Sequence, residues 1–350
     1  MIISSKDSDP NQKKAKKASK VVSELELIAD KDENIKLRPS SLKGYIGQDR
    51  VIRQLKLIIE SAKIRNKMPE HILFYGQPGL GKTTLAYLIS TEIECHLKTI
   101  AAPALQKTGD IVSLLVNMEP NTVLFIDEIH RLKAPLEETL YAAMEDGHVD
   151  LVMGKGQGLS VGKIDLHPFM LVGATTQLGR ISKPLKDRFP TIFQLEPYSE
   201  SDILALFDRN LEILKINMSE EAKILVCRRC RGVPRIANNI IKRFVDLQTV
   251  HNIKEITLSD AKDFLLELGI YELGLTKSDL QYLRSLLYSS LSLKTLGGIL
   301  MEDTETLELV TEPYLIHLGF IDKGSEGRRL TLKGADFIQK FDKTKPVGLL

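Results

Sequence analysis

The sequence is poor in the residues and runs that mark several classes of protein. It has no tryptophan and three cysteines, an odd number without the spacing of a disulfide framework, which favours a reducing compartment. Its apolar runs are short, and the stretch at 122–126 is far too short to span a bilayer. The lysines near the N-terminus are not followed by the apolar stretch of a secretory signal. We therefore expect a cytoplasmic protein with no membrane partner.

Two of the cysteines have a spacing that zinc sites also use. Cys227 and Cys230 are separated by two arginines, but no second cysteine pair or histidine pair lies near them. They also follow directly on an apolar helical pattern at 224–226. We favour buried structural thiols over a zinc site.

The charge is nearly balanced. Lys and Arg number 48 against 46 Asp and Glu, so the net charge of +2 does not by itself indicate a nucleic-acid binder. Five lysines do gather at residues 11–20, inside a polar opening that covers residues 1–36. We interpret residues 1–36 as a solvated, disordered tail rather than a specific DNA contact.

Residues 37–197 alternate between short apolar runs and helical patterns, which predicts an α/β domain. Because the apolar runs are nearly continuous, we expect buried strands of a parallel sheet with helices on both faces. The expected strands are 72–75, 98–101, 123–126 and 170–173, with helices between them at 83–93, 110–116 and 136–144.

One segment of this domain interrupts the alternation. Residues 150–166 read as two β-like arms around a glycine-rich turn, so we expect a hairpin inserted between two core strands. Val152, Met153 and Leu159 would be exposed apolar positions on it. An ordinary surface hairpin and a partner-docking arm both fit this pattern.

The rest of the chain predicts two smaller domains and a tail. Residues 198–272 are helical and suggest a small lid domain. Residues 273–340 combine three helices, the last at 304–317, with two short strands at 320–322 and 329–332, which is the pattern of a winged helix. Residues 341–350 remain as a C-terminal tail.

The segment Gly76-Gln-Pro-Gly79-Leu-Gly81-Lys82-Thr83 satisfies the phosphate-loop pattern G-x-x-x-x-G-K-[ST]. Its glycines allow backbone N–H groups to close around phosphate oxygens, and the following helix adds positive charge at its N-terminus. Lys82 would reach the β- and γ-phosphates, and the Thr83 hydroxyl would bind Mg²⁺. This pattern predicts binding of ATP with Mg²⁺.

A second acidic motif, Thr122 to His130, suggests hydrolysis. An apolar strand delivers Asp127 and Glu128 at its C-terminal end, beside the phosphate loop in a parallel sheet. Asp127 would hold Mg²⁺, and Glu128 would polarise the attacking water. For His130, contact with a ligand and a capping or packing role both remain open.

Two arginines lie where an ATP-driven motor needs mobile cations. Arg188 precedes another expected strand, and Arg235 opens a helix of the lid domain. Arg188 would reach the γ-phosphate of a neighbouring subunit, and Arg235 would link the lid to the nucleotide.

The motifs together resemble the RuvB family, the bacterial Holliday junction branch-migration ATPases of the AAA+ class, over residues 37–337. The motifs that carry the resemblance are "LRPSSLKGYIGQ", "YGQPGLGKTTLA", "LFIDEIHRL", "AMED", "VGATT", "PLKDRF", "RGVPRIAN" and "EPYLIHLGF". The fold class that this implies is an AAA+ P-loop ATPase core with a parallel sheet, followed by a helical lid and a C-terminal winged helix.

The resemblance also implies roles for single residues. Thr176, in preference to Thr175, would be the sensor after the hairpin, and Arg188 would be the finger that acts on a neighbouring subunit. The implied nucleotide contacts are Leu37, Arg38, Tyr45 and Ile46 beside the adenine; Gly79, Gly81, Lys82, Thr83 and Thr84 around the phosphates and Mg²⁺; and Glu145, Asp146, Gly147, Arg188, Tyr198 and Arg235.

The implied partners follow from the same resemblance. The hairpin at about 150–166 matches the arm that docks on RuvA, with the resolvase RuvC in the wider complex. Lys323 and Arg328 match basic positions that contact duplex DNA at Holliday junctions. The subunits would form a hexameric ring, since Arg188 is useful only at a subunit boundary.

Some positions depart from the family pattern, and two other functions remain as alternatives. Gln177 replaces an arginine, and the wing brings Glu326 towards phosphate. The first alternative is another AAA+ machine, such as a clamp-loader subunit. The second is an ATP-switched, sequence-specific regulator, which would need base-reading side chains, whereas the helix at 304–317 is acidic and apolar.

Overall fold

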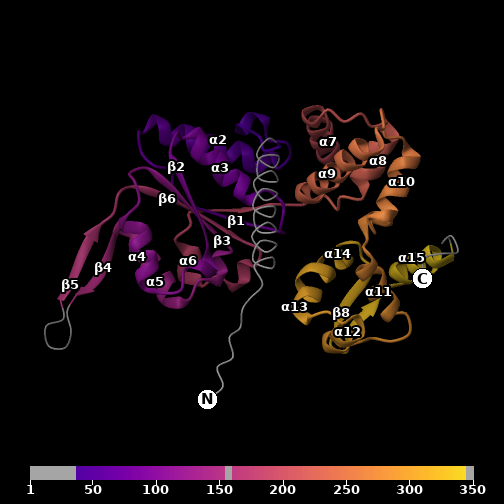
Figure 1. Ribbon diagram of the computed structural model, residues 1–350. Helices are drawn as coiled ribbons and strands as arrows, with labels where there is room; N and C mark the ends of the chain where they lie inside the picture. Colours follow the sequence, from indigo (N-terminus) through magenta and orange to yellow (C-terminus); the bar gives the residue numbers. More distant parts are fainter. Residues whose placement is uncertain (1–36, 154–159, 344–350) are drawn as a thin grey trace, which may run out of the picture. The chain divides into compact units, whose positions relative to one another are not determined.

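The computed structural model describes residues 37–153 and 160–343 (Figure 1). The chain divides into two compact units, one ending at Tyr198 and the other beginning at Ser199 and containing most of the residues beyond it. The expected tail at 1–36 lies outside the described residues, as do Leu159 and the side chains of Val152 and Met153. Across the described ranges, no helix has the length and apolar character needed to cross a membrane.

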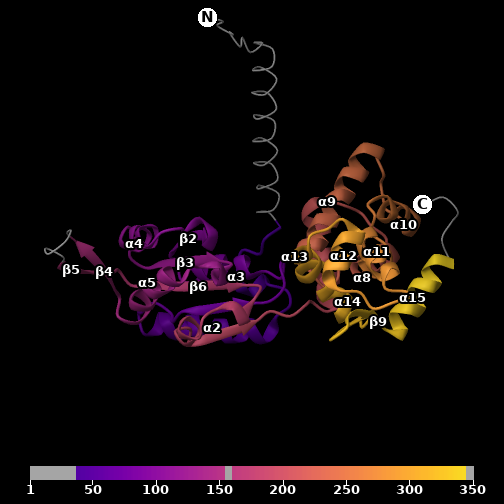
Figure 2. The same cartoon turned by 90° about the horizontal axis from the view of Figure 1, so that it is seen from below.

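The first unit is built on a five-stranded parallel sheet in the order β2-β3-β6-β1-β7. Its strands are β1 (Ile72–Tyr75), β2 (His96–Ala101), β3 (Thr122–Asp127), β6 (Phe169–Thr175) and β7 (Thr191–Gln194). Every residue of β6 is buried, which requires cover on both faces of the sheet. Helices supply that cover (Figure 2). They are α2 (Asp49–Ile64), α3 (Lys82–Glu92), α4 (Thr108–Val116), α5 (Ala134–Glu145) and α6 (Lys183–Asp187).

The strand order brings three motifs to one edge of the sheet. β6 lies between β1 and β3, with Tyr75 opposite Thr175 and Ile126 opposite Gly173. Since all three strands are parallel, their carboxyl ends meet at the same edge. The segments after these strands, which begin at Gly76, Glu128 and Thr176, are therefore neighbours.

A separate two-stranded antiparallel hairpin extends from the same unit. It consists of β4 (His148–Met153) and β5 (Ser160–Asp165), with Asp150 opposite Lys163. In the chain, the hairpin follows α5 and precedes β6, so it is inserted in the sequence between the sheet strands β3 and β6.

The second unit begins with four lid helices: α7 (Glu200–Leu214), α8 (Glu220–Arg228), α9 (Pro234–His251) and α10 (Leu258–Glu267). The side chains of Ser219 and Thr257 cap α8 and α10 by accepting hydrogen bonds from first-turn N–H groups. Cys227 and Cys230 are buried in this domain, and burial raises the pKa of the Cys227 thiol to about 12. Both therefore pack as small apolar side chains.

The unit ends in a winged helix around a core that includes Tyr282, Leu307, Leu315 and Ile338. Its elements are α11 (Lys277–Ser285), α12 (Leu293–Leu300), α13 (Thr304–Thr306), the π-helical turn η7 (Leu307–Thr311), α14 (Glu312–His317), β8 (Ile321–Gly324), β9 (Gly327–Leu330) and α15 (Leu332–Lys343).

The helix expected at 304–317 was confirmed in its bounds, whereas the strand expected at 329–332 was wrong at its C-terminal end. The helix expected at 304–317 contains the π-helical turn before Pro313, whose ring lacks the N–H that a regular helix uses there. The strand expected at 329–332 ends at Leu330, because Leu332 begins α15, a helix that the sequence pattern did not predict.

Candidate functional site

The phosphate loop joins β1 to α3 in a conformation that depends on glycine. Gly76, Gly79 and Gly81 have φ values of 150°, 83° and 104°, a region that side chains disfavour. A Cβ atom at Gly76 would lie 2.5 Å from the Leu195 carbonyl oxygen. The glycines therefore serve both the turn itself and its close contact with the segment after β7.

Lys82 lies across this loop. Its Nζ donates hydrogen bonds to the carbonyl oxygens of Gly76 (2.8 Å) and Gln77 (3.0 Å), and the residue is only 7% exposed. The ammonium group is thus held over the turn, where the N-terminus of α3 adds positive partial charge. Thr83 and Thr84 follow on the first turn of α3.

Two tyrosines that the resemblance places at the nucleotide lie beside Gly81 of the loop. The Tyr198 hydroxyl donates a hydrogen bond to the Tyr45 hydroxyl at 2.9 Å. A Cβ atom at Gly81 would lie 2.4 Å from the Tyr45 hydroxyl oxygen, so glycine permits this contact. Burial raises the pKa of Tyr45 to about 12. Of the other expected adenine contacts, Leu37 is buried at the start of the described chain.

Glu128 and Thr176 meet at the sheet edge, as the strand order requires. A carboxylate oxygen of Glu128 accepts hydrogen bonds from the Thr176 backbone N–H (3.1 Å) and hydroxyl (3.0 Å). Glu128 has a left-handed backbone conformation with φ 48°, which turns it away from the direction of β3. Beside it, an Asp127 carboxylate oxygen accepts the Glu128 N–H.

His130 belongs to the same cluster of polar groups. Its Nδ1 lies 3.1 Å from the Glu128 carboxylate and 2.9 Å from the Thr175 hydroxyl, and its side chain is 5% exposed. Burial lowers the pKa of His130, and the nearby negative charge of Glu128 opposes this change without reversing it. Of the two roles left open, the structure thus gives His130 a packed, hydrogen-bonding position that also touches Glu128.

Arg188 ends α6 and is held against α5. Its guanidinium donates to Glu145 (2.8 Å) and to the Pro184 carbonyl oxygen (3.0 Å), and it stacks 4.5 Å from the Tyr141 ring centroid. Its Nε has no hydrogen-bond partner among the described residues. The structure therefore brings together Arg188 and Glu145, two residues expected to serve the nucleotide. Asp146 and Gly147 follow Glu145 directly and lead into β4.

Arg235 lies in the second unit and is exposed on the first turn of α9. The loop before it contains Arg231 and Gly232, which both have left-handed backbone conformations.

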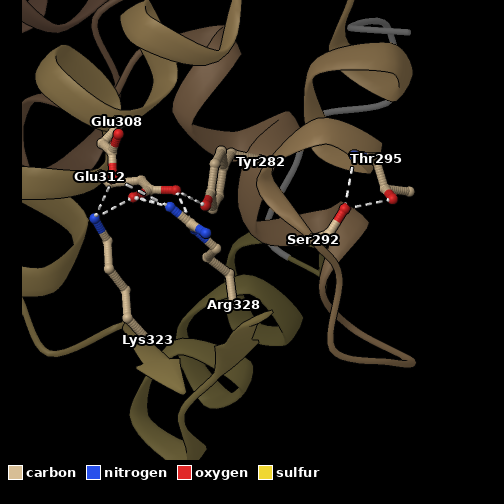
Figure 3. A network of polar contacts seen from close by, with 7 residues as sticks. All are labelled: Tyr282, Ser292, Thr295, Glu308, Glu312, Lys323 and Arg328. Atoms are coloured by element: carbon tan, nitrogen blue, oxygen red, sulfur yellow. Dashed lines mark hydrogen bonds and ion pairs between the residues drawn. The ribbon is translucent and has the colours of Figure 1, made fainter. Parts of the chain in front are cut away.

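The two expected DNA-contact residues of the wing are bound to acidic side chains of the same domain (Figure 3). Arg328 Nε donates to Glu312 at 2.8 Å, and Lys323 Nζ lies 2.6 Å from the other oxygen of the same carboxylate. The Glu312 side chain is fully buried and also accepts the Tyr282 hydroxyl at 2.7 Å. Burial alone would raise the pKa of Glu312, but hydrogen bonds from Arg328, Lys323 and Tyr282 lower it.

The two cations differ in how far they reach the surface. The Lys323 side chain is 39% exposed, whereas that of Arg328 is 17% exposed. Glu308, which is 50% exposed, lies within 3.6 Å of both. The sequence did not predict this cluster. The acidic composition of the helix expected at 304–317 was the one signal that pointed to it.

Three family descriptions match successive parts of the chain. "Holliday junction DNA helicase RuvB P-loop domain" matches residues 37–195, "RuvB AAA lid domain" matches 198–271, and "RuvB C-terminal winged helix domain" matches 272–339.

Individual relatives agree with these matches. The chain is 43% identical over 310 residues to the Holliday junction branch migration complex subunit RuvB of Lactobacillus gasseri, covering 87% of this chain and 91% of that protein. The Fusobacterium nucleatum protein of the same name is 40% identical over 327 residues, covering 92% and 98%. The solved structure of the Thermotoga maritima RuvB Holliday junction branch migration motor is 36% identical with a TM-score of 0.78, covering 87% and 98%. The chain described here therefore belongs to the RuvB family.

Proposed function

We propose that this protein is an ATP-hydrolysing ring motor that translocates duplex DNA and drives branch migration of Holliday junctions in recombination and repair. The observation that carries the proposal is the meeting of the phosphate loop, Glu128 and Thr176 at one sheet edge, in a chain that also has a winged helix. The names of the relatives, which are subunits of branch migration complexes, support the same function.

ATP would be bound between the phosphate loop and the Tyr45–Tyr198 pair. Lys82 neutralises phosphate charge, and the hydroxyl of Thr83 and the carboxylate of Asp127 are oxygen donors of the kind that Mg²⁺ prefers. When bound, Mg²⁺ supplies charge stabilisation to the phosphoryl group as it is transferred. Glu128 orients and deprotonates the attacking water, after its carboxylate has turned from Thr176 towards that water.

Hydrolysis depends on a neighbouring subunit in this proposal. Arg188 donates a hydrogen bond to Glu145, which Asp146 and Gly147 follow, and this surface would face the nucleotide of the next subunit in a hexameric ring. Arg235 would link the lid to the nucleotide. Both arginines stabilise charge that develops during phosphoryl transfer.

The remaining partners are assigned by surface. The β4–β5 hairpin would dock on RuvA, with RuvC joining the wider complex in the cytoplasm. Lys323 and Arg328 would contact DNA phosphates, which makes binding dependent on salt and largely independent of sequence.

The two alternatives have less support. A clamp-loader subunit usually ends in a helical collar, whereas this chain matches a winged helix at 272–339. A sequence-specific regulator needs base-reading side chains, but Glu312 is buried and Glu308 is paired with cations of the wing.

The test of the proposal is a synthetic four-way junction incubated with the protein, ATP and Mg²⁺, with and without RuvA. We expect ATP-dependent branch migration that RuvA increases, and ATPase activity that any duplex DNA stimulates. ATP-dependent binding to a single DNA sequence without turnover would instead support the regulator.

A further inference from the structure

The loop between α8 and α9, within the lid, contacts the winged-helix domain. It contains residues 229–233, and its two successive left-handed residues, Arg231 (φ 54°) and Gly232 (φ 67°), turn the chain sharply before α9 begins. Cys230 within it is fully buried. A constrained loop of this kind holds its side chains in fixed directions.

Arg231 makes three contacts outside the lid. Its Nη2 donates to Asp279 on α11, its Nε donates to the Gly274 carbonyl oxygen at 2.8 Å, and its guanidinium lies 4.4 Å from the ring centroid of Tyr314 on α14. The side chains of Arg231 and Asp279 are 14% and 4% exposed. A charge-assisted, largely buried hydrogen bond with a stacked guanidinium has a fixed geometry, unlike an exposed ion pair.

The residues that receive Arg231 are themselves fixed within the winged helix. The Asp279 carboxylate also accepts the N–H and hydroxyl of Thr276, both at 2.7 Å, and so caps α11. The Tyr314 hydroxyl donates to the Leu273 carbonyl oxygen at 2.7 Å. Arg231 therefore contacts α11, α14 and the segment that precedes α11 at once.

The linker between the lid and the winged helix, residues 268–276, also packs against the loop at 229–233. Arg229 Nη1 donates to the Ile270 carbonyl oxygen at 3.0 Å. A Cβ atom at Gly274 would lie 2.3 Å from the Arg229 carbonyl oxygen, so the two backbones touch. The connection thus combines backbone packing with the Arg231 contacts, so the two domains are joined by more than the chain of the linker itself.

We propose that Arg231 is a positioning residue that makes the lid and the winged helix move as one body. Arg231 lies four residues before Arg235, so the loop that orients the nucleotide-facing end of α9 also orients the DNA-facing domain. When the lid moves during ATP hydrolysis, the winged helix moves with it and carries the bound DNA along. This inference rests on the proposed function, in which Arg235 contacts nucleotide and the winged helix contacts DNA.

The test compares Arg231→Ala with wild type for ATP hydrolysis, DNA binding and branch migration of a four-way junction. Arg231 would transmit motion rather than bind a ligand, so Arg231→Ala should still bind ATP and DNA. We expect the number of base pairs migrated per ATP hydrolysed to fall about tenfold, a size typical of lost coupling between sites. Arg231→Lys keeps the charge but loses the planar fork and its second hydrogen bond, so it should fall between the two.

The matched control is Arg284→Ala, which removes an arginine–aspartate pair that lies wholly within the winged helix, between α11 and Asp342 of α15. This variant should leave the number of base pairs migrated per ATP hydrolysed unchanged. Limited proteolysis gives a readout independent of activity: Arg231→Ala should be cleaved faster in the linker at 268–276 than wild type or the control.

The outcomes separate this inference from the proposed function. Unchanged linker cleavage and an unchanged amount of migration per ATP in Arg231→Ala would overturn the inference. If wild type itself fails to migrate junctions, the proposed function is wrong, and the proteolysis result still decides whether Arg231 fixes the two domains to each other.

Discussion

Glu128, the proposed general base, is held by its neighbours in a position that it would have to leave to reach the attacking water. Its backbone φ of 48° is unfavourable for a non-glycine residue by about 1 kcal/mol or more, and its carboxylate accepts two hydrogen bonds from Thr176. Such strain is found where a side chain must be aimed at a ligand. If Thr176 is the sensor and Glu128 activates water, as proposed, this contact would couple the two directly.

The Glu128→Gln variant should bind ATP but lose turnover. Glutamine keeps the size and the hydrogen-bonding capacity of the side chain but cannot take a proton, so we expect kcat to fall by about 10²–10⁴-fold. Steady-state ATPase assays and nucleotide binding measure the two effects separately. Glu138→Gln, on the exposed face of α5, is the control and should behave as wild type. Normal hydrolysis by Glu128→Gln would remove Glu128 from the mechanism.

His71, at the residue before β1, makes the stability of the ATPase domain depend on pH. Its Nδ1 accepts the Leu171 N–H at 2.9 Å, and its Nε2 faces the Met144 carbonyl oxygen at 3.3 Å, which fixes a neutral ring with the proton on Nε2. Burial lowers the pKa of His71 from its usual 6.5. The unfolded chain thus binds a proton more readily than the folded chain, so stability is kept above pH 6.5 and lost as pH falls below it.

Urea unfolding at pH 8 and pH 5.5 tests this expectation. For wild type, protonation of His71 should lower the free energy of unfolding by at most about 1.4 kcal/mol per pH unit. His71→Gln can make both hydrogen bonds without titrating, so it should remove that part of the pH dependence. His167→Gln, an exposed histidine before β6, should not. Equal pH dependence in wild type and His71→Gln would contradict the assignment.

At the scale of elements, Glu312 fixes the wing to α14. Removal of this buried carboxylate would leave Arg328 and Tyr282 without their partner, so we expect Glu312→Ala to destabilise the winged helix by about 3–5 kcal/mol. Hydrogen exchange of the amides of α11 and α14 localises the effect. Glu308→Ala removes an exposed carboxylate and should cost less than about 1 kcal/mol. Full protection in Glu312→Ala would show that the carboxylate does not hold the wing.

The same cluster predicts unequal roles for the two cations in DNA binding. Lys323 is more exposed than Arg328, so Lys323→Ala should weaken binding to all duplex sequences alike and reduce the salt slope by about 1. Arg328→Ala should reduce the slope less than Lys323→Ala and should mainly lower the stability of the domain. DNA titrations at several salt concentrations measure the slope, and an unchanged slope for Lys323→Ala would remove it from the DNA contact.

The elements show which parts of the structure could be predicted from the sequence. β1, the phosphate loop and α3 were predictable because glycine conformations, strand hydrophobicity and helix periodicity are local. The convergence of Glu128 with Thr176 depends on β6 lying between β1 and β3, an order that the sequence pattern did not predict. The family resemblance named Tyr45 and Tyr198, but their contact joins positions far apart in sequence and has no local signal.

The missed features share a physical cause. Lys323 and Arg328 have the sequence pattern of surface cations because their buried partner, Glu312, lies on another element, and a carboxylate of this kind looks like any helix-face acid in a sequence. Arg231 has no distinguishing signal for the same reason, since its partner Asp279 has the pattern of a helix cap. Helix α15 was missed because the wing pattern extends to Leu332 in the sequence.

In the whole assembly, one subunit would complete the ATPase site of the next. Arg188 is held against Glu145 and Tyr141, and none of its contacts in the described chain is to the phosphate loop. A cation in that position serves hydrolysis only by facing the nucleotide of another copy. ATPase activity should therefore depend on assembly and rise with protein concentration.

Mixing two inactive variants tests this claim most directly. Lys82→Ala subunits lack the phosphate contact but keep Arg188, and Arg188→Ala subunits keep the phosphate loop. Each variant alone should be nearly inactive, and an equal mixture should recover about a quarter of wild-type ATPase, because about one interface in four pairs an intact loop with an intact arginine. Full activity of Arg188→Ala alone, or no recovery at any mixing ratio, would contradict hydrolysis by neighbouring subunits.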